Sequence, residues 1–262
     1  MSVTYRVNQL IRAVAGRKRG RTAAIILAGG VGSRMNHPNG MTKQMMLLAG
    51  KPILSHAVRP FEECPYIDDI VVVARREEAD AVRALLSEEK ISKLRCVVYG
   101  GDTRQESAKN GFDALSHDVM FVAIHDAARC MVTSSMIADV VSAAYEFKAA
   151  SAACRVTDTI KRAGNDGIVL ETLDRQTLWA ATTPQIFYAD LYRAALYMAE
   201  KEHFRATDDN MLVEHVGHRV KLIDCGPENF KITVKADLIM AEVVLRLRES
   251  EGKKGSKSKK KN

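Results

Sequence analysis

The chain has 262 residues, of which 47% are hydrophobic and 27% are charged, and its formal net charge is +7. This length and composition are those of an ordinary globular protein with one core, so we expect a single folded domain. The positive charge is concentrated at the two ends, because residues 1–22 carry six Lys or Arg without an acid and residues 253–262 carry six Lys. The stretch between them is acidic, which argues against a nucleic-acid partner.

We therefore predict three parts: a basic N-terminal extension at 1–22, the folded domain at 23–250, and a basic tail at 251–262. From residue 253 the tail has no apolar residue to bury, so it is expected to be disordered. The extension places Val7, Leu10, Ile11 and Val14 at helical spacing, which fits a short amphipathic helix or a transit-like segment.

The sequence gives no sign of a membrane partner or of an oxidising compartment. No run approaches the roughly 18 apolar residues of a membrane span, and the apolar core of a secretory signal is missing. The five cysteines are scattered, without a pair at Cys-x-x-Cys spacing. A reducing, cytoplasmic-type location is the expectation.

From residue 23 onward, short β-rich apolar runs alternate with stretches of helical period. In chain order the pattern predicts strand 23–27, helix 53–61, strand 70–74, helix 77–86, strand 96–99, helix 104–115, strand 119–124, helix 134–147, strand 151–156, helices 189–199 and 208–215, strand 219–223 and helix 234–246. This alternation indicates an α/β fold with a Rossmann-like, mostly parallel sheet covered by helices on both faces.

Residues 157–174 interrupt the alternation. They are polar, and Gly164-Asn165-Asp166-Gly167 forms a turn signal between two flanks that can form strands. Such a segment is typical of a β-hairpin that projects from the sheet and needs a partner surface to order it. We expect it to be a dimerisation arm.

A glycine-rich loop follows the first predicted strand, running from Ala28 through Gly29, Gly30 and Gly32 to Arg34. Glycines let backbone N–H groups approach phosphate oxygens, and the arginine can neutralise charge there. The loop matches neither the dinucleotide fingerprint nor the P-loop. The pair Lys43-Gln44 follows on the same connection, as in sugar-phosphate nucleotidyltransferases.

Two later strand ends also carry polar motifs, and ligands of open α/β sheets bind at such ends. Gly101 and Asp102 precede a helix that begins near Arg104, which suits a nucleobase edge or a phosphate, although Asp102 could simply be the helix N-cap. Asp126 and Arg129 follow the strand 119–124. They suit a Mg²⁺ or hydroxyl contact with a phosphate clamp, or else a structural ion pair.

Over about residues 23–247 the sequence resembles the 2-C-methyl-D-erythritol 4-phosphate cytidylyltransferase family. The resemblance rests on nine motifs in one order: Ala28-Gly29-Gly30-Val31-Gly32-Ser33-Arg34-Met35, Lys43-Gln44, Gly100-Gly101-Asp102-x-Arg104-x-x-Ser107, His125-Asp126-Ala127-Ala128-Arg129, Asp158-Thr159-Ile160-Lys161, Asp174-Arg175-x-x-Leu178-Trp179, Thr183-Pro184-Gln185-x-Phe187, Thr207-Asp208-Asp209 and Asn229-Phe230-Lys231-Ile232-Thr233.

The resemblance implies transfer of CMP from CTP to a sugar-alcohol phosphate, with Mg²⁺ or another divalent cation on the phosphates, by a homodimer that exchanges its arms. It implies catalytic roles for Arg34 and Lys43. The implied nucleotide-binding residues are Ala28, Gly29, Gly30, Gly32, Gly101, Asp102, Ser107 and Lys231. The implied acceptor-binding residues are Asp126, Arg129, Thr183, Thr159, Lys161 and Arg175, with Thr159 and Arg175 supplied by the partner subunit.

Two alternatives remain open at this point. The related ribitol-5-phosphate cytidylyltransferases also begin their loop with Ala-Gly-Gly, although Asp-Ala-Ala-Arg, Asp-Thr-Ile-Lys and Asp-Arg-x-x-Leu-Trp favour methylerythritol phosphate. A catalytically weak nucleotide-binding homologue is the other alternative. The basic residues and Asp126 of the motifs argue against it.

Overall fold

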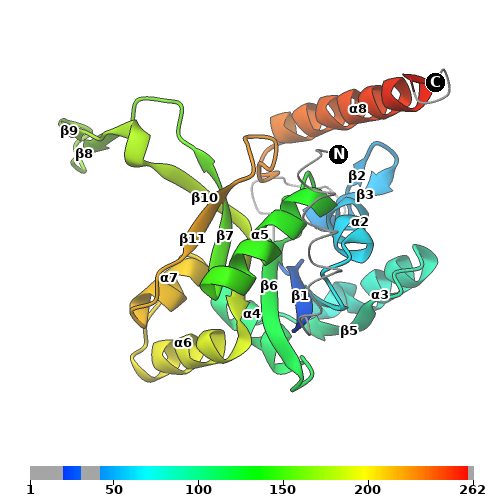
Figure 1. Ribbon diagram of the computed structural model, residues 1–262, viewed down its shortest axis with the longest axis horizontal. Coiled ribbons are helices and arrows are strands. Elements are labelled where there is room, and N and C mark those ends of the chain that lie inside the picture. The colour runs from blue at the N-terminus through cyan, green and yellow to red at the C-terminus, as the bar shows by residue number, and fades with distance from the viewer. Residues whose placement is uncertain (1–19, 31–41, 259–262) are drawn as a thin grey trace.

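The computed structural model describes residues 20–30 and 42–258. Residues 1–19, 31–41 and 259–262 lie outside the described part, and with them the predicted extension helix and the predicted site residues Gly32 and Arg34. A seven-stranded sheet in the order β11-β7-β10-β6-β1-β4-β5 forms the centre (Figure 1). Its strands are β1 (Arg21–Leu27), β4 (Asp69–Ala74), β5 (Leu94–Tyr99), β6 (Val119–Asp126), β7 (Ala149–Arg155), β10 (Trp179–Tyr188) and β11 (Lys221–Asp224).

The sheet is parallel except for β10, which confirms the predicted mostly parallel α/β fold. Strand β10 runs antiparallel between β6 and β7 and was missed by the sequence reading. The strand is hard to recognise in the sequence, because Thr182, Thr183 and Pro184 interrupt the apolar pattern. The ladder to β7 shifts register between Ala181 and Gln185, and such an irregularity accommodates a proline inside a sheet.

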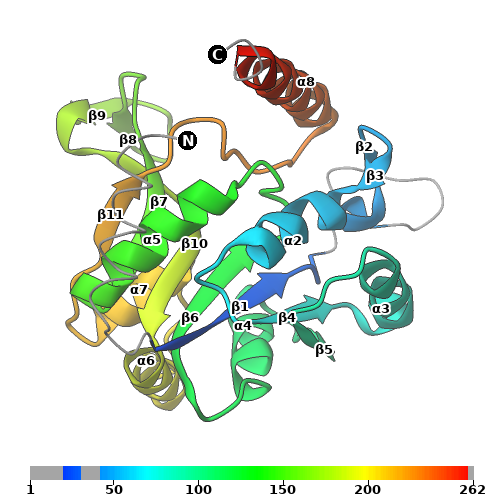
Figure 2. The same ribbon diagram turned by 45° about the vertical axis from the view of Figure 1, so that its right-hand side comes forward.

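Helices cover both faces of the sheet, as predicted (Figures 1 and 2). Buried residues of α2, α3 and α5 pack on one face, and buried residues of α4, α6 and α7 pack on the other. The helices are α2 (Ile53–Glu63), α3 (Ala79–Glu88), α4 (Arg104–Asp113), α5 (Ser134–Phe147), α6 (Ala189–Lys201), α7 (Asp209–His215) and α8 (Lys235–Ser258).

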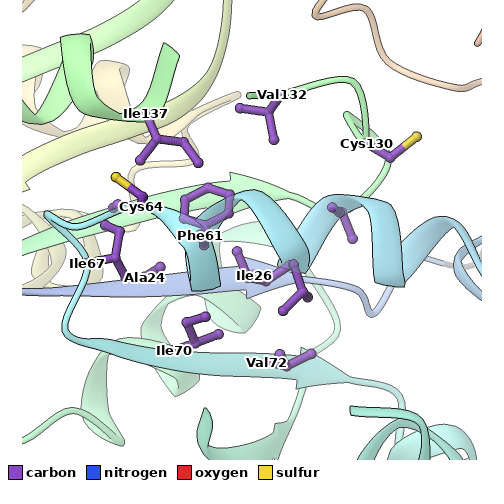
Figure 3. Packing of buried hydrophobic residues seen from close by; sticks show 14 of the residues in the cluster. Ala24, Ile26, Phe61, Cys64, Ile67, Ile70, Val72, Cys130, Val132 and Ile137 are labelled. Atoms are coloured by element: carbon purple, nitrogen blue, oxygen red, sulfur yellow. The ribbon is translucent and has the colours of Figure 1, made fainter. Parts of the chain in front are cut away.

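Alternation along β1 builds these two cores. Ala24 and Ile26 belong to the cluster under α2, whereas Ile25 belongs to the cluster under α4, because successive strand residues face opposite sides. Figure 3 shows Phe61 of α2 lying over Ala24 and Ile26 of β1. Burial on both faces explains why the strand reads as a continuous apolar run.

Both ends of the predicted domain differ from the expectation. Strand β1 begins at Arg21, two residues early, because the Arg21 side chain bonds Asp69 at 2.9 Å and Asp118 at 2.8 Å. At the other end, α8 continues to Ser258, so part of the tail expected to be disordered is helical. Extending an existing helix costs far less free energy than nucleating one, so α8 can continue into a polar sequence that would not form a helix alone.

The predicted hairpin is present and projects from the body (Figure 1). Strands β8 (Lys161–Ala163) and β9 (Val169–Thr172) pair antiparallel, with Gly167 in the turn at φ +79°. Every residue of both strands is exposed. A second small ribbon, β2 (Leu47–Leu48) with β3 (Lys51–Pro52), leads into α2.

Gly111 sets how closely α4 approaches the sheet. A Cβ at this position would lie 2.5 Å from Cγ2 of Ile25 and 2.9 Å from Cγ2 of Val73. Alanine would favour the helix by about 1 kcal/mol, but overpacking a core costs about 1–3 kcal/mol. Both contacts are shorter than 3.0 Å, which places the packing cost in the upper part of that range. We therefore expect Gly111→Ala to lower the free energy of unfolding by about 1–2 kcal/mol, measured by urea titration.

The exposed Lys109 of the same helix provides the control for this substitution. Lys109→Ala removes only a surface ion pair with Asp113, so it should stay within about 0.5 kcal/mol of the wild-type value. Unchanged or higher stability of Gly111→Ala would mean that α4 does not depend on this close approach.

Candidate active site

The carboxyl ends of β1, β5 and β6 meet at one edge of the sheet, where ligands of open α/β sheets bind. Leu27 of β1 pairs with Asp126 of β6, and the backbone N–H of Ala127 donates to the carbonyl of Leu27 at 3.0 Å. The next residues, Ala28, Gly29 and Gly30, therefore run beside Asp126. A Cβ added at Gly29 would meet no atom of the described residues within 4 Å.

Lys43 reaches this edge from the short 3-10 helix η2 (Lys43–Met45). Its Nζ donates to the backbone carbonyl of Ile232 at 3.1 Å. The side chain of the neighbouring Gln44 is buried and donates to the carbonyl of Gly30 at 3.4 Å. The start of the glycine loop, the Lys43-Gln44 motif and the segment around Lys231 are thus held together.

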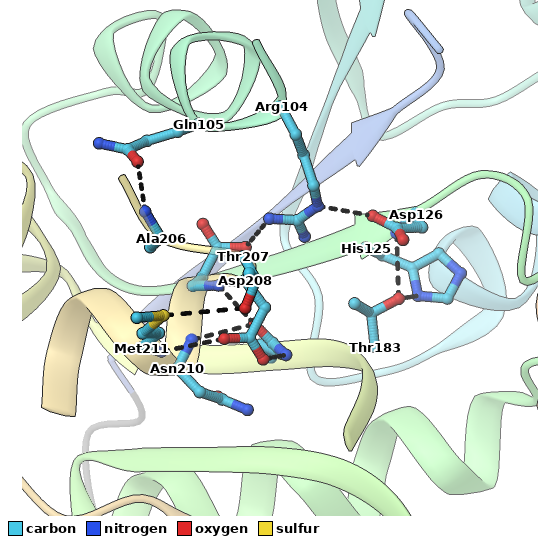
Figure 4. Close-up of polar contacts among 12 residues, drawn as sticks. Arg104, Gln105, His125, Asp126, Thr183, Ala206, Thr207, Asp208, Asn210 and Met211 are labelled. Atoms are coloured by element: carbon cyan, nitrogen blue, oxygen red, sulfur yellow. Dashed lines mark hydrogen bonds and ion pairs between the residues drawn. The ribbon is translucent and has the colours of Figure 1, made fainter. Parts of the chain in front are cut away.

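Asp126, the last residue of β6, lies at the centre of the site (Figure 4). Its Oδ2 accepts from Nζ of Lys231 at 2.8 Å, and its Oδ1 accepts from Nε of Arg104 at 3.1 Å. Burial alone would raise the pKa of this carboxyl, but the charges of Arg104 and Lys231 outweigh burial and hold the pKa well below its usual range. Asp126 is therefore ionised at neutral pH.

His125 and Thr183 fix the backbone around Asp126. The backbone N–H of Asp126 donates to Oγ1 of Thr183 at 3.0 Å, and this oxygen lies 3.0 Å from Nδ1 of His125. Nε2 of His125 lies 3.2 Å from the carbonyl oxygen of Arg129. A carbonyl only accepts, so Nε2 carries the proton and Nδ1 accepts from the threonine hydroxyl. Burial lowers the pKa of His125 from 6.5 to about 3, which keeps the ring neutral.

The end of β5 contributes a second glycine segment. The backbone N–H of Gly101 donates to Oγ of Ser107 at 3.1 Å, and a Cβ at Gly101 would lie 2.4 Å from Cβ of Glu106. Thr103 is the N-cap of α4 and forms a capping box with Glu106. The alternative that made Asp102 the N-cap is therefore wrong, and the Asp102 side chain stays exposed.

The structure brings many of the predicted site residues together and leaves others apart. Ala28, Gly29, Gly30, Lys43, Asp126, Arg129, Thr183 and Lys231 lie at the β1–β6 edge, and Gly101, Asp102 and Ser107 follow β5. Thr159, Lys161 and Arg175 lie on the projecting arm or its base instead. There Lys161 bonds Thr172 at 2.6 Å and Arg175 bonds the carbonyl of Thr157 at 2.8 Å.

The sequence reading assigned no role to Arg104, Asp209 or Tyr192, which belong to the same polar group. Nη1 of Arg104 donates to Oδ2 of Asp209 at 2.7 Å, and the hydroxyl of Tyr192 donates to Oδ1 of Asp209 at 2.6 Å. Asp209 is fully buried. The signal was present, because Arg104 and Asp209 lie inside quoted motifs, but their pairing joins residues 105 apart in the chain.

The described residues offer no protein site for a divalent cation. No group of three or more His, Cys, Asp or Glu side chains in residues 20–30 and 42–250 is arranged to hold a metal ion. Both carboxylate oxygens of Asp126 already contact cationic side chains. The expected metal contact at Asp126 does not fit this arrangement.

A Rossmann-like sheet with a glycine loop, basic side chains and a central carboxylate at its carboxyl edge defines a nucleotidyltransferase. The profile of the family described as 2-C-methyl-D-erythritol 4-phosphate cytidylyltransferase matches residues 22–247. The chain belongs to this family. The nucleotide chemistry of its members explains why the polar motifs collect at strand ends.

Curated relatives and solved structures agree with this assignment. The 2-C-methyl-D-erythritol 4-phosphate cytidylyltransferase of Caldanaerobacter subterraneus is 40% identical over 86% of this chain and 98% of the relative. That of Symbiobacterium thermophilum is 40% identical over 85% of this chain and 92% of the relative. Among structures, 4-diphosphocytidyl-2C-methyl-D-erythritol synthase from Anaerococcus prevotii superposes with a TM-score of 0.77 at 28% identity, covering 86% of this chain and 96% of the other.

The neutral His125 makes stability depend on pH. Between its folded pKa of about 3 and its usual 6.5, the unfolded chain binds a proton that the folded chain does not. The stabilisation of the folded state that comes from the neutral His125 is present above pH 6.5 and is lost as the pH falls below that value. From pH 7.5 to pH 5 the loss is about 2 kcal/mol. We expect His125→Asn, which keeps an acceptor for Thr183, to reduce the pH dependence of unfolding free energy by about this amount.

The measurement is urea unfolding of both proteins at the two pH values. The absolute stability of the variant is expected to fall at both, so only the difference between pH values carries the result. His117→Asn, which changes an exposed histidine, is the control and should keep the wild-type difference. The same difference in His125→Asn as in wild type would show that folding does not lower the pKa of His125.

Proposed function

We propose that the protein transfers CMP from CTP to 2-C-methyl-D-erythritol 4-phosphate, giving 4-diphosphocytidyl-2-C-methyl-D-erythritol and pyrophosphate. The observation that carries this proposal is the group around Asp126. There Arg104 and Lys231 bond one carboxylate at the sheet edge, in a chain of the cytidylyltransferase family. Lys43 and Arg129 lie nearby, bonded to the backbone carbonyls of Ile232 and Asn229 in the segment that carries Lys231. Such a group offers positive charge for phosphates and an acceptor for a sugar hydroxyl.

In this reaction a phosphate oxygen of the acceptor attacks the α-phosphorus of CTP in line. The bond from the α-phosphorus to the bridging oxygen breaks, and pyrophosphate leaves with that electron pair. The attacking monoester is already ionised at neutral pH, so no general base is needed. The neutral His125 contacts Thr183 and a backbone carbonyl, so its hydrogen bonds serve the protein backbone.

The barrier is mainly electrostatic, because both reactants are anions. We assign Lys43 and Arg34 to the developing charge at the α-phosphate and Lys231 to the triphosphate. Lys43 supports this assignment by its position, since its Nζ lies beside residue 232 at the edge where β1 ends. Ionised Asp126 and Arg129 are assigned to the acceptor. Ala28, Gly29, Gly30, Gly101, Asp102 and Ser107 are assigned to the nucleotide.

We propose that Mg²⁺, or another divalent cation, enters with the phosphates of CTP. The phosphates are its proposed ligands, since no group of three or more His, Cys, Asp or Glu side chains in the described part of the chain could hold a metal ion. The ion supplies neutralisation of phosphate charge when bound. No step of the proposed mechanism assigns it a protein ligand.

We further propose a homodimer in which each arm covers the partner's site. Three large apolar side chains on the arm, Ile168, Val169 and Leu170, are 54–65% exposed. A two-stranded ribbon is marginally stable alone, and a two-fold interface would bury these side chains. It would also carry Thr159, Lys161 and Arg175 to an acceptor from which they lie apart within one chain.

A reducing, cytoplasmic-type location remains our proposal. All five cysteines are free, and burial raises the pKa of the Cys130 and Cys225 thiols to about 12, which makes them poor nucleophiles. Among the described residues, no helix is long and apolar enough to cross a membrane.

The test of the function is pyrophosphate release with each acceptor and each of the four nucleoside triphosphates. The proposal expects turnover with CTP and methylerythritol phosphate, and much less with ribitol 5-phosphate or another nucleotide. Preference for ribitol 5-phosphate would replace the acceptor but keep the reaction class. No release with any pair would support the catalytically weak homologue instead.

Removing one preorganised charge costs about 3 kcal/mol at the transition state. We therefore expect Lys43→Ala and Arg34→Ala each to lower kcat by about a hundredfold or more while CTP still binds. Steady-state turnover and equilibrium CTP binding are the two measurements. Near-normal kcat in either folded variant would remove that residue from the catalytic set.

Mixing two inactive proteins tests the arm exchange. If Lys43 acts in its own subunit and Arg175 acts across the dimer, a mixed dimer of Lys43→Ala and Arg175→Ala has both lesions in one site and an intact second site. Random reassociation makes about half the dimers mixed, so activity should return to about a quarter of wild type. Each variant reassociated alone is the control. Confirmed subunit exchange without recovered activity would exclude action in trans.

A further inference from the structure

Arg104 joins two carboxylates from different parts of the fold. Its Nε donates to Oδ1 of Asp126 at the end of β6 (Figure 4). Its Nη1 donates to Oδ2 of Asp209 at the start of α7. A guanidinium is planar and holds its N–H vectors in a fixed fork. The direction of one bond therefore constrains the direction of the other.

The Asp209 end of this bridge is rigid. Asp209 has no exposed surface, its other oxygen accepts from the Tyr192 hydroxyl at 2.6 Å, and its backbone N–H donates to Oε1 of Gln185 at 2.9 Å. Tyr192 is itself fully buried and stacks on Phe187. Arg104 therefore fixes the position of the Asp126 carboxylate relative to the buried residues around Asp209.

The other cation on Asp126 is held differently. The side chain of Lys231 is 42% exposed and that of Arg104 is 29% exposed. Both bond Asp126, but Arg104 has a second carboxylate partner, the fully buried Asp209. Lysine is a flexible point charge with rotatable donors. Lys231 can therefore move from Asp126 to a phosphate while Arg104 still pairs with Asp126. Arg104 cannot move in this way without leaving the buried Asp209 without its cation.

We propose that Arg104 is a positioning residue that holds Asp126 for the acceptor through its bond to Asp209, while Lys231 exchanges between Asp126 and the nucleotide. This inference rests on the proposed function, and it adds a division of labour between the two cations. Arg104 fixes Oδ1, so Oδ2 stays directed to where Lys231 now lies. When the lysine moves to the triphosphate, Oδ2 becomes the acceptor for a sugar hydroxyl.

The structural alternative is that Arg104 only neutralises the buried Asp209. The two roles differ in kinetics. A stability defect lowers the fraction of active protein and hence kcat, but it leaves the KM of the remaining enzyme unchanged. Loss of positioning at an acceptor-binding carboxylate raises the KM for the acceptor and spares the KM for CTP.

The first variants separate charge from geometry. Arg104→Met leaves Asp209 buried without its cation, so stability is expected to fall. Arg104→Met combined with Asp209→Asn removes a matched pair of charges and should recover most of that stability. In both proteins we expect the KM for the acceptor to rise about tenfold or more, with kcat and the KM for CTP within about threefold.

Arg104→Lys covers the case in which neither variant folds. It keeps the positive charge beside Asp209, but a single ammonium lacks the planar fork that bonds both carboxylates. The acceptor KM should rise here too. Lys109→Met, on the exposed face of the same helix, is the matched control and should keep wild-type values.

A double-mutant cycle with Asp126→Asn completes the test. If Arg104 acts through Asp126, adding Arg104→Met to Asp126→Asn changes the acceptor kcat/KM by less than about threefold. Wild-type acceptor KM in the charge-matched double variant, or additive losses in the cycle, would overturn the inference and leave the proposed function intact. A wild-type protein without CMP transfer to either acceptor would overturn the proposed function, and this inference with it.

Discussion

The site depends on one requirement, that a buried carboxylate at the end of β6 stays ionised. Burial opposes the charge of Asp126, and Arg104 and Lys231 together overcome that effect. Those two side chains come from the start of α4 and from the segment before α8, and Thr183 of β10 holds the backbone N–H of Asp126. Compensation of one charge thus brings together four elements that are distant in sequence.

The same requirement explains why the site contains more basic side chains than acidic ones. Arg104 and Lys231 pair with Asp126 and Asp209, whereas Lys43 and Arg129 bond backbone carbonyls, so the group retains excess positive charge for anionic reactants. An all-basic group would repel itself before substrate binds. The carboxylates separate the cations and hold them in place, which lowers the reorganisation needed when phosphates arrive.

The sequence was sufficient for the parts of the fold that are encoded locally. Continuous apolar runs identified β1, β4 and β6, and the turn glycines identified the β8–β9 hairpin. Strand β10 was missed because Pro184 and its polar neighbours break the local pattern, and its place is decided by the two strands beside it. The glycine and polar motifs after β1, β5 and β6 were predicted for a similar reason, since their place directly after a strand can be read from the local sequence.

Pairing between those residues was not predictable in this way. The Lys43 contact with the carbonyl of Ile232 spans 189 residues, and the Asp126–Lys231 pair spans 105. Composition also misjudged the end of α8, where helix propagation from a formed segment outweighs the polar sequence. Arg104 and Asp209 both lie in motifs of the sequence, but only the tertiary structure shows that the charge of Arg104 compensates that of the buried Asp209.

The arm differs from the body in how little of its own surface it buries. The seven-stranded sheet buries both faces within one chain, whereas the hairpin of β8, its turn and β9 leaves Ile168, Val169 and Leu170 exposed, and no residue of the two strands is buried. A segment with so little burial contributes little to the stability of its own subunit. Its apolar residues would gain free energy of burial only against another surface, which the proposed dimer would supply. In that dimer the arm and its base would bring Lys161 and Arg175 with the apolar residues, so burial of the arm and the approach of positive charge to an anionic acceptor would occur together.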